Sequence, residues 1–114
     1  MYTLAIDFET ANRNSRSICA FGWSVLSNGR VTESKQVLIN PEENFDAGNI
    51  RVHGIRPSDV FDAPTLPEAM EAHGLYDLIA GAQLIVAHNA SFDMGALQKA
   101  IQKYDMYQMP AFTY

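Results

Sequence analysis

The chain has 114 residues, of which 8 are Lys or Arg and 13 are Asp or Glu, so its formal net charge is −5. This length fits a single domain, and 47% hydrophobic against 18% charged residues exclude a disordered chain. The acidic balance argues against a protein that holds nucleic acid by a general basic surface. No apolar run reaches the ~18 residues of a membrane span. The single cysteine, Cys19, allows no internal disulfide and favours a cytoplasmic protein.

The first half of the sequence predicts three strands followed by an irregular segment. Residues 2–6 form a short apolar run rich in β-branched and aromatic side chains, and residues 17–26 and 30–39 predict two further strands. Between the last two, Ser27-Asn28-Gly29 predicts a hairpin turn, because Asn and Gly tolerate a positive φ. Residues 40–64 are rich in Pro, Gly, Asn and Asp and predict an irregular segment with one helical turn.

The second half predicts two helices on either side of a strand. A helix is expected from Thr65, which begins a capping box, to Gly81, a residue typical of helix ends. Residues 83–88 predict a fully buried strand, and residues 91–104 predict a second long helix. The order β-β-β-α-β-α predicts a mixed α/β sheet with an antiparallel hairpin on one side.

The last predicted segment, residues 106–114, is apolar and extended, and the sequence stops inside it. Domains normally end on polar surface residues. We therefore expect residues 1–114 to belong to a longer domain. An incomplete sheet is expected to leave an apolar edge exposed around Tyr104 to Tyr114, which would favour self-association.

Two acidic residues continue the first strand and are candidate metal ligands. Alternate residues of a strand share a face, so Asp7 and Glu9 lie on the same face, roughly 6.5–7 Å apart. This separation suits two metal ions spaced ~3.5–4 Å apart in phosphoryl-transfer sites. An isolated D-x-E is also common at the solvated end of a strand, so this pair alone predicts no site.

A third acid, Asp93, falls near the centre of the apolar arc of the second predicted helix. That arc contains Phe92 and Leu97, while Met94 and Lys99 are expected on the opposite, solvated face. A carboxylate directed at the sheet is costly unless a positive group pairs with it. Because no Lys or Arg is near in sequence, we expect a divalent cation such as Mg²⁺ or Mn²⁺ as its partner.

Three segments of the chain carry a resemblance to a known family. They are Asp7-Phe8-Glu9-Thr10, His53-Gly54-Ile55 and His88-Asn89-Ala90-Ser91-Phe92-Asp93. In order and spacing they resemble the motifs of DnaQ-like 3′–5′ exonucleases, the DEDD group, which includes the epsilon subunit of bacterial DNA polymerase III. The resemblance implies a ribonuclease H-like α/β fold: a mixed sheet with an antiparallel hairpin and flanking helices, incomplete at the C-terminus. It also implies that residues 1–114 are the N-terminal two-thirds of a single exonuclease domain.

The resemblance further implies a metal-dependent 3′–5′ exonuclease with two Mg²⁺ or Mn²⁺ ions. Asp7 is implied to bridge both ions, Glu9 to bind one and Asp93 to assist the other. Contacts with the terminal nucleotide are implied for Phe8, Thr10, Ala11, His53 and Phe92. The implied partners are the 3′ end of single-stranded nucleic acid, DNA favoured over RNA, and a polymerase or other replication protein.

One part of the family pattern has no match in the sequence. The third motif, a His or Tyr general base followed by a fourth aspartate, is not found after Asp93. We therefore expect little or no nuclease activity from this chain alone. Two other interpretations stay open: an exoribonuclease of the oligoribonuclease or ribonuclease T type, and a non-catalytic nucleic-acid-binding or interaction module on the same scaffold. His88 is expected to cap the helix or bond the backbone, and Cys19 to be a small core residue.

Overall fold

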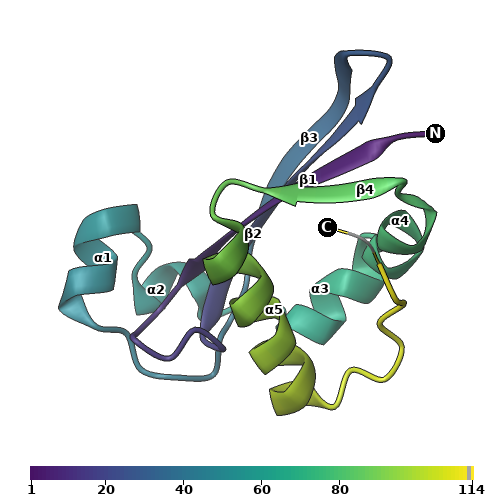
Figure 1. The fold of residues 1–114 in the computed structure, drawn as a ribbon. Coiled ribbons are helices and arrows are strands. Elements are labelled where there is room, and N and C mark those ends of the chain that lie inside the picture. The colour runs from purple at the N-terminus through teal and green to yellow at the C-terminus, as the bar shows by residue number, and fades with distance from the viewer. Residues whose placement is uncertain (113) are drawn as a thin grey trace.

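The computed structural model describes residues 1–112 and 114, within which four strands and five helices form (Figure 1). The strands are β1 (Thr3–Thr10), β2 (Ile18–Ser27), β3 (Arg30–Leu38) and β4 (Leu84–Ala87). The helices are α1 (Ala47–His53), α2 (Pro57–Val60), α3 (Leu66–Ala72), α4 (Leu75–Gly81) and α5 (Ala90–Tyr104). The predicted mixed α/β fold class is confirmed.

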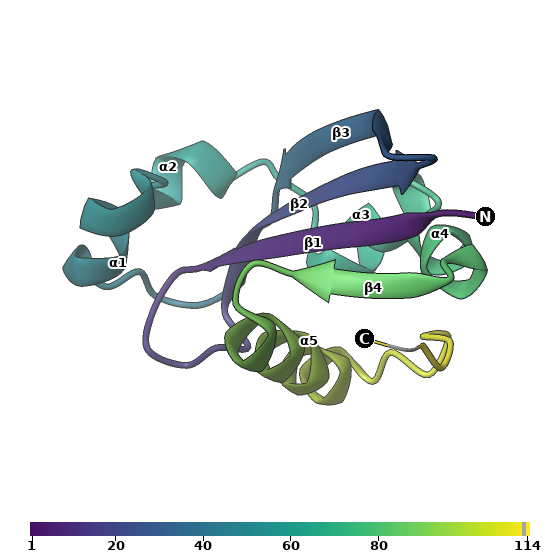
Figure 2. The same cartoon turned by 45° about the horizontal axis from the view of Figure 1, so that its top comes forward.

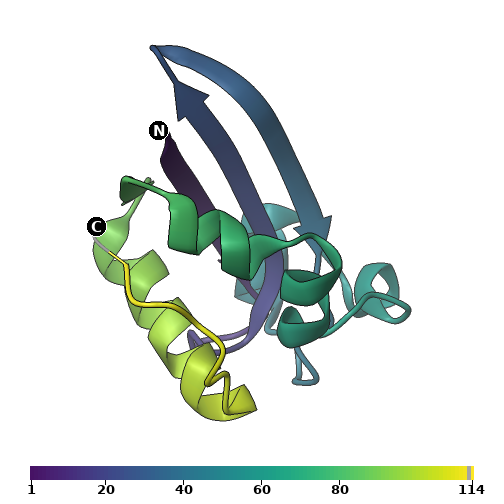
Figure 3. The ribbon, with the colours of Figure 1, turned by 90° about the vertical axis from the view of Figure 1, so that its right-hand side faces the viewer.

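The four strands form one sheet in the order β3-β2-β1-β4 (Figure 2). β2 runs antiparallel to both β1 and β3, whereas β4 runs parallel to β1. The turn between β2 and β3 has positive φ at Asn28 (53°) and Gly29 (76°), which confirms the predicted hairpin. The tip of this hairpin projects beyond the rest of the molecule (Figures 1 and 3).

The hydrophobic core lies on one face of the sheet. Leu4, Ile6 and Phe8 alternate along β1 and point to the face that α3, α4 and α5 cover (Figure 3). Ala5 and Asp7 point to the other face, which no helix covers in the part of the chain that the structure describes (Figure 2). The sheet is therefore buried on one side and open on the other.

The predicted helix from Thr65 to Gly81 is wrong, because two helices occupy that range. The capping box at its start is present, with the Thr65 amide donating to Glu68 Oε1 at 2.9 Å. The helix breaks at Gly74, whose φ of 63° lies in the left-handed region that glycine adopts without steric cost. Gly74 then serves as the residue before the first turn of α4.

The segment between the sheet and these helices also contains more helix than predicted. In place of one turn, residues 40–64 form α1 and α2. α1 ends at Gly54, again with a left-handed φ of 76°, and α2 begins with Pro57, whose fixed φ suits a first helical position. None of the residues of α1 is buried.

Two predictions of side-chain burial are wrong, because burial depends on which faces of the strands and helices are covered by other elements. β4 was expected to be fully buried, but Leu84 is 37% and Val86 41% exposed, and only Ile85 is in the core. β4 lies at the edge of the sheet, and Leu84 and Val86 share its open face. Met94 was expected in solvent but is 4% exposed, because α5 packs against both β1 and β4 and buries a wider arc.

The segment after α5 folds back instead of extending away. It runs beside α5 toward α4 (Figures 2 and 3), with Met106 buried and Met109 and Phe112 packed against the core. The predicted extended segment is therefore wrong, and its exposed aromatic side chains are Tyr107 and Tyr114. Self-association through this region stays a prediction. Across the residues described, no helix is both long and apolar enough to cross a membrane.

Candidate active site

The acidic residues meet at one end of the sheet. β1 and β4 are parallel and adjacent, so their carboxyl ends lie at the same edge. Asp7 and Glu9 come from the end of β1, and Asp93 comes from the first turn of α5, which follows β4. The β1–β2 register shifts between Glu9 and Thr10, so a bulge follows directly after the second acid.

Asp93 is held by backbone amides. It is 1% exposed; its Oδ1 accepts a hydrogen bond from the Phe8 amide at 3.1 Å, and its Oδ2 accepts one from the Asn89 amide at 3.3 Å. Asn89 caps α5, since its side chain accepts from the Phe92 amide at 3.4 Å. Two N–H donors thus partner this buried carboxylate and connect α5 to β1.

Burial and neighbouring negative charge disfavour the charged forms of Glu9 and Asp93. Burial raises the pKa of Glu9, and the negative charges of Asp7 and Asp93 raise it further, against the opposing effect of His53. Burial also raises the pKa of Asp93, with the Asp7 charge adding to it, while the two amide hydrogen bonds oppose the shift. A bound cation would relieve this repulsion.

A hollow of about 430 Å³ gathers the acids with residues from α1 and the start of α5. It is lined by Asp7, Phe8, Glu9, Thr10, Gly48, Asn49, Val52, His53, His88, Asn89, Phe92 and Asp93. Seven of the eight predicted site residues are among them. Ala11 lies outside: it is fully buried, its amide donates to the Ser17 carbonyl at 2.8 Å, and its carbonyl accepts from the Asp46 amide at 2.8 Å.

The apolar part of the hollow comes from two helices. Phe92 is 36% exposed at the start of α5, and Val52 is 82% exposed on α1. Phe8 contributes only backbone, because its ring packs against Phe21 at 4.6 Å between centroids. The sequence did not indicate Val52, since it lies in a segment predicted to be irregular.

Both ring nitrogens of His53 are engaged with the backbone. Nδ1 accepts a hydrogen bond from the Ile55 amide at 2.9 Å, so the ring proton is on Nε2, which donates to the Thr10 carbonyl at 2.8 Å. Asn49, one turn earlier in α1, donates from Nδ2 to the same carbonyl at 3.0 Å. The sequence did not indicate Asn49; its only signal is the four-residue spacing from His53.

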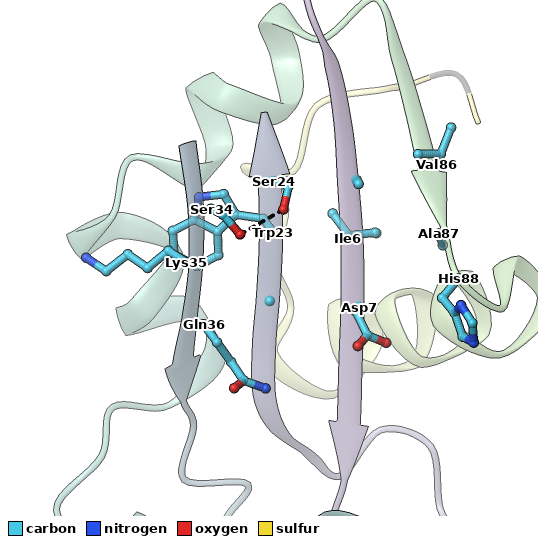
Figure 4. A pocket seen from close by; sticks show the side chains of 12 residues that line it. Ile6, Asp7, Trp23, Ser24, Ser34, Lys35, Gln36, Val86, Ala87 and His88 are labelled. Carbon is cyan, nitrogen blue, oxygen red and sulfur yellow. Dashed lines mark hydrogen bonds between the residues drawn. The ribbon is translucent and has the colours of Figure 1, made fainter. Parts of the chain in front are cut away.

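A second, shallower hollow adjoins the first on the open face of the sheet (Figure 4). Asp7 and His88 line both hollows. The rest of its lining includes Val86 of β4 and the hydroxyls of Ser24 and Ser34, which lie 3.0 Å apart on β2 and β3. The Asp7 carboxylate is thus accessible from two sides.

The donor chemistry of the site suits a hard divalent cation. Carboxylate oxygens are the ligands that Mg²⁺ and Mn²⁺ prefer, and a cation would offset the negative charge that raises the pKa of Glu9 and Asp93. Over residues 1–112 and 114, no three His, Cys, Asp or Glu side chains stand close enough together to hold an ion as they are. Asp7 is exposed and has room to turn, so an ion would draw the carboxylates together.

The four-stranded mixed sheet with its flanking helices has the ribonuclease H-like fold. Solved structures share this fold. Exonuclease X in complex with 5′ overhanging duplex DNA superposes with a TM-score of 0.70 at 24% identity, covering 82% of this chain and 52% of that one. A 3′-exonuclease that recognises the 3′ end of a histone mRNA stem-loop superposes with a TM-score of 0.72 at 19% identity, covering 90% and 41%.

Sequence comparison gives the family. The RNase_T model, described as exonuclease, matches residues 4–114, so the chain belongs to this exonuclease family. The DNA polymerase III subunit epsilon of Haemophilus influenzae is 31% identical over 111 residues, which cover 90% of this chain. The chain spans 42% of the length of that relative.

Proposed function

We propose that this chain carries the metal-binding carboxylates and part of the nucleotide site of a metal-dependent 3′–5′ exonuclease. The observation that supports this most is the meeting of Asp7, Glu9 and Asp93 in one hollow, where the charge of Asp7 raises the pKa of both Glu9 and Asp93. Two Mg²⁺ or Mn²⁺ ions held by these carboxylates would supply an activated water and charge stabilisation for the leaving 3′ oxygen.

The chain's own residues suit the end of a single strand of nucleic acid. Phe92 and Val52 offer apolar surface to a base or sugar on either side of the acids. The backbone from Phe8 to Thr10 lies alongside them, and Asp93 is fixed against it by the Phe8 amide. We propose that the 3′-terminal nucleotide lies in this hollow with its phosphate toward the acids.

The identity of the substrate and partner is proposed from the relatives. The epsilon subunit is a component of DNA polymerase III by its name, and the exonuclease X structure contains DNA, which together favour DNA and a polymerase partner in the cytoplasm. The histone mRNA 3′-exonuclease shares the fold equally well, so an exoribonuclease is the second candidate.

The general base and a fourth carboxylate are proposed to come from outside residues 1–114. The histidines that line the hollow are His53, whose ring nitrogens both bond the backbone, and His88. No tyrosine is among the lining residues described. The 114-residue chain is therefore expected to bind metal ions but to show little or no nuclease activity.

Calorimetry with Mn²⁺ tests the proposal. The wild-type chain is expected to bind the ion, and the isosteric double variant Asp7→Asn/Glu9→Gln to lose most of that binding. Asp62→Asn, which removes an exposed acid outside the hollow, serves as the control. Equal binding by the wild type and the double variant would favour a non-catalytic module.

Incubation with labelled oligonucleotides tests the remaining parts. Robust Mn²⁺-dependent digestion by the 114-residue chain would contradict the absence of a general base. The degradation rates of DNA and RNA strands of the same sequence, measured with the natural protein that contains this chain, decide between the two substrate classes.

A further inference from the structure

The helix α1 forms a wall of the acidic hollow without packing into the core. Gly48, Asn49, Val52 and His53 line the hollow, yet none of the seven residues of α1 is buried. Burial of apolar side chains usually holds a helix on a protein, and α1 has little of it, because its least exposed apolar side chain, Ile50, is only half-buried. Polar contacts must therefore contribute to the position of this wall.

Those polar contacts converge on the carbonyl oxygen of Thr10. It accepts hydrogen bonds from Asn49 Nδ2 at 3.0 Å and from His53 Nε2 at 2.8 Å, so side chains of α1 use both of its lone pairs. Asn49 Nδ2 also lies 3.3 Å from Thr10 Oγ1 and 3.2 Å from the Asn12 carbonyl. Asn49 and His53 are four residues apart and so share one face of α1.

The ladder between β1 and β2 is irregular beside this carbonyl, and the extra residue of the β-bulge lies in β2. Glu9 pairs with Ala20 and Thr10 with Ile18, so the ladder skips Cys19 at this point. Cys19 is fully buried, and its Sγ lies 3.8 Å from His53 Nε2, behind the ring. The irregular backbone that follows Glu9 is thus fixed from one side by β2 and from the other by α1.

The His53 ring is restricted to one tautomer by its two backbone partners. Nδ1 accepts from the Ile55 amide just after α1, and Nε2 donates to Thr10 at the end of β1. The imidazole therefore bridges the end of α1 and the end of β1. A ring engaged in this way has no free nitrogen for a substrate.

We propose that Asn49 and His53 are positioning residues of this site. By holding the Thr10 carbonyl they fix α1 as a wall of the hollow and fix the backbone that carries Glu9. Where this concerns the metal, it rests on the proposed function; the attachment of α1 does not depend on that function.

Hydrogen exchange and NMR test the attachment without reference to metal or activity. The Gly54 amide, which bonds the Ile50 carbonyl at 2.7 Å, reports on α1, and the Ile39 amide, which bonds the Cys19 carbonyl at 2.9 Å, reports on the sheet. In Asn49→Asp, which keeps the size but removes the donor, exchange at Gly54 is expected to accelerate at least ~10-fold with Ile39 unchanged. Arg51→Gln, on the same helix and outside the hollow, is the control.

The imidazole nitrogen shifts of the wild-type chain give an independent result that needs no variant. The proton is expected on Nε2, with Nδ1 unprotonated. A ring carrying its proton on Nδ1, or Gly54 exchange as slow in Asn49→Asp as in the wild type, would overturn the proposal.

Mn²⁺ affinity then tests the effect on the site. His53→Gln is expected to weaken binding by ~10-fold or more, as loss of supporting groups commonly does, while Arg51→Gln leaves it unchanged. Unchanged affinity in His53→Gln would overturn the positioning of Glu9. If the wild-type chain binds no Mn²⁺, the proposed metal site fails, and the attachment of α1 is decided by exchange and the ring tautomer.

Discussion

The two walls of the acidic hollow are built in opposite ways. α5 has 15 residues, buries five of them, and is joined to β1 through Asp93. α1 has seven residues, buries none of them, and is attached through hydrogen bonds to Thr10. One wall therefore shares the stability of the core, whereas the other is free to open separately. A single site can thus combine a rigid side that holds an acid with a side that is attached mainly through polar contacts.

The largest expected effect is on the α5 side. Asp93→Ala leaves the Phe8 and Asn89 amides without their acceptor, so the free energy of unfolding is expected to fall by about 2–4 kcal/mol. Asp7→Ala, at an exposed acid of the same hollow, is expected to stay within about 0.5 kcal/mol of the wild type. Urea unfolding of both variants measures these changes in the free energy of unfolding. Equal changes in the two variants would contradict a special structural role of Asp93.

A smaller effect is expected where the segment before α1 is joined to α5. Glu43 Oε2 accepts from Lys103 Nζ at 2.7 Å and from Arg16 Nε at 3.0 Å. Glu43→Gln is expected to cost about 1–2 kcal/mol at neutral pH. Lys103, in the last turn of α5, forms this link.

The pH dependence of that loss has a definite sign. Burial would raise the pKa of Glu43, but the hydrogen bonds and charges of Lys103 and Arg16 outweigh it and lower the pKa below 4.5. A lowered native pKa contributes stability above pH 4.5, and this contribution is lost as the pH falls through the native value. The difference between wild type and Glu43→Gln should therefore shrink toward zero in acid. The exposed Glu71→Gln is the control, and a difference independent of pH would contradict the ion pairs.

The smallest effect comes from a matched pair of helical glycines. A Cβ at Gly95 of α5 meets nothing within 4 Å, and one at Gly48 of α1 meets only the Arg51 side chain at 3.8 Å. Gly95→Ala is expected to raise the free energy of unfolding by about 0.5–1 kcal/mol. Gly48→Ala is expected to slow local opening of α1 while leaving global unfolding unchanged. Equal gains in urea unfolding would mean that α1 unfolds together with the core.

Short sequence motifs correctly predicted those features that depend only on residues close together in the chain. The Asn28-Gly29 turn and the capping box at Thr65 are such cases. The break at Gly74 was missed because a glycine within a helical pattern is compatible with either a break or continuation. The exposure of Val86 and the burial of Met94 depend on which faces other elements cover, which periodicity alone does not determine.

The sequence predicted the acidic residues of the site but not the contacts made by α1. Strand alternation and helix periodicity indicated Asp7, Glu9 and Asp93 because these acids lie in regular elements. Asn49 lies in a segment predicted to be irregular, so nothing placed it beside β1. The His53 ring bonds the Thr10 carbonyl beside a β-bulge, and no residue type near Thr10 predicts that bulge.

The two edges of the sheet differ in how they would meet another strand. β3 carries Arg30, Glu33 and Lys35 along an exposed edge, and such alternating charges discourage intermolecular pairing. β4 carries only Leu84 to Ala87, with no charge, and pairs with β1 alone in the part of the chain described. Aggregation at high concentration should therefore begin at β4, and a lysine in place of Val86 is the change that would improve the solubility of this chain.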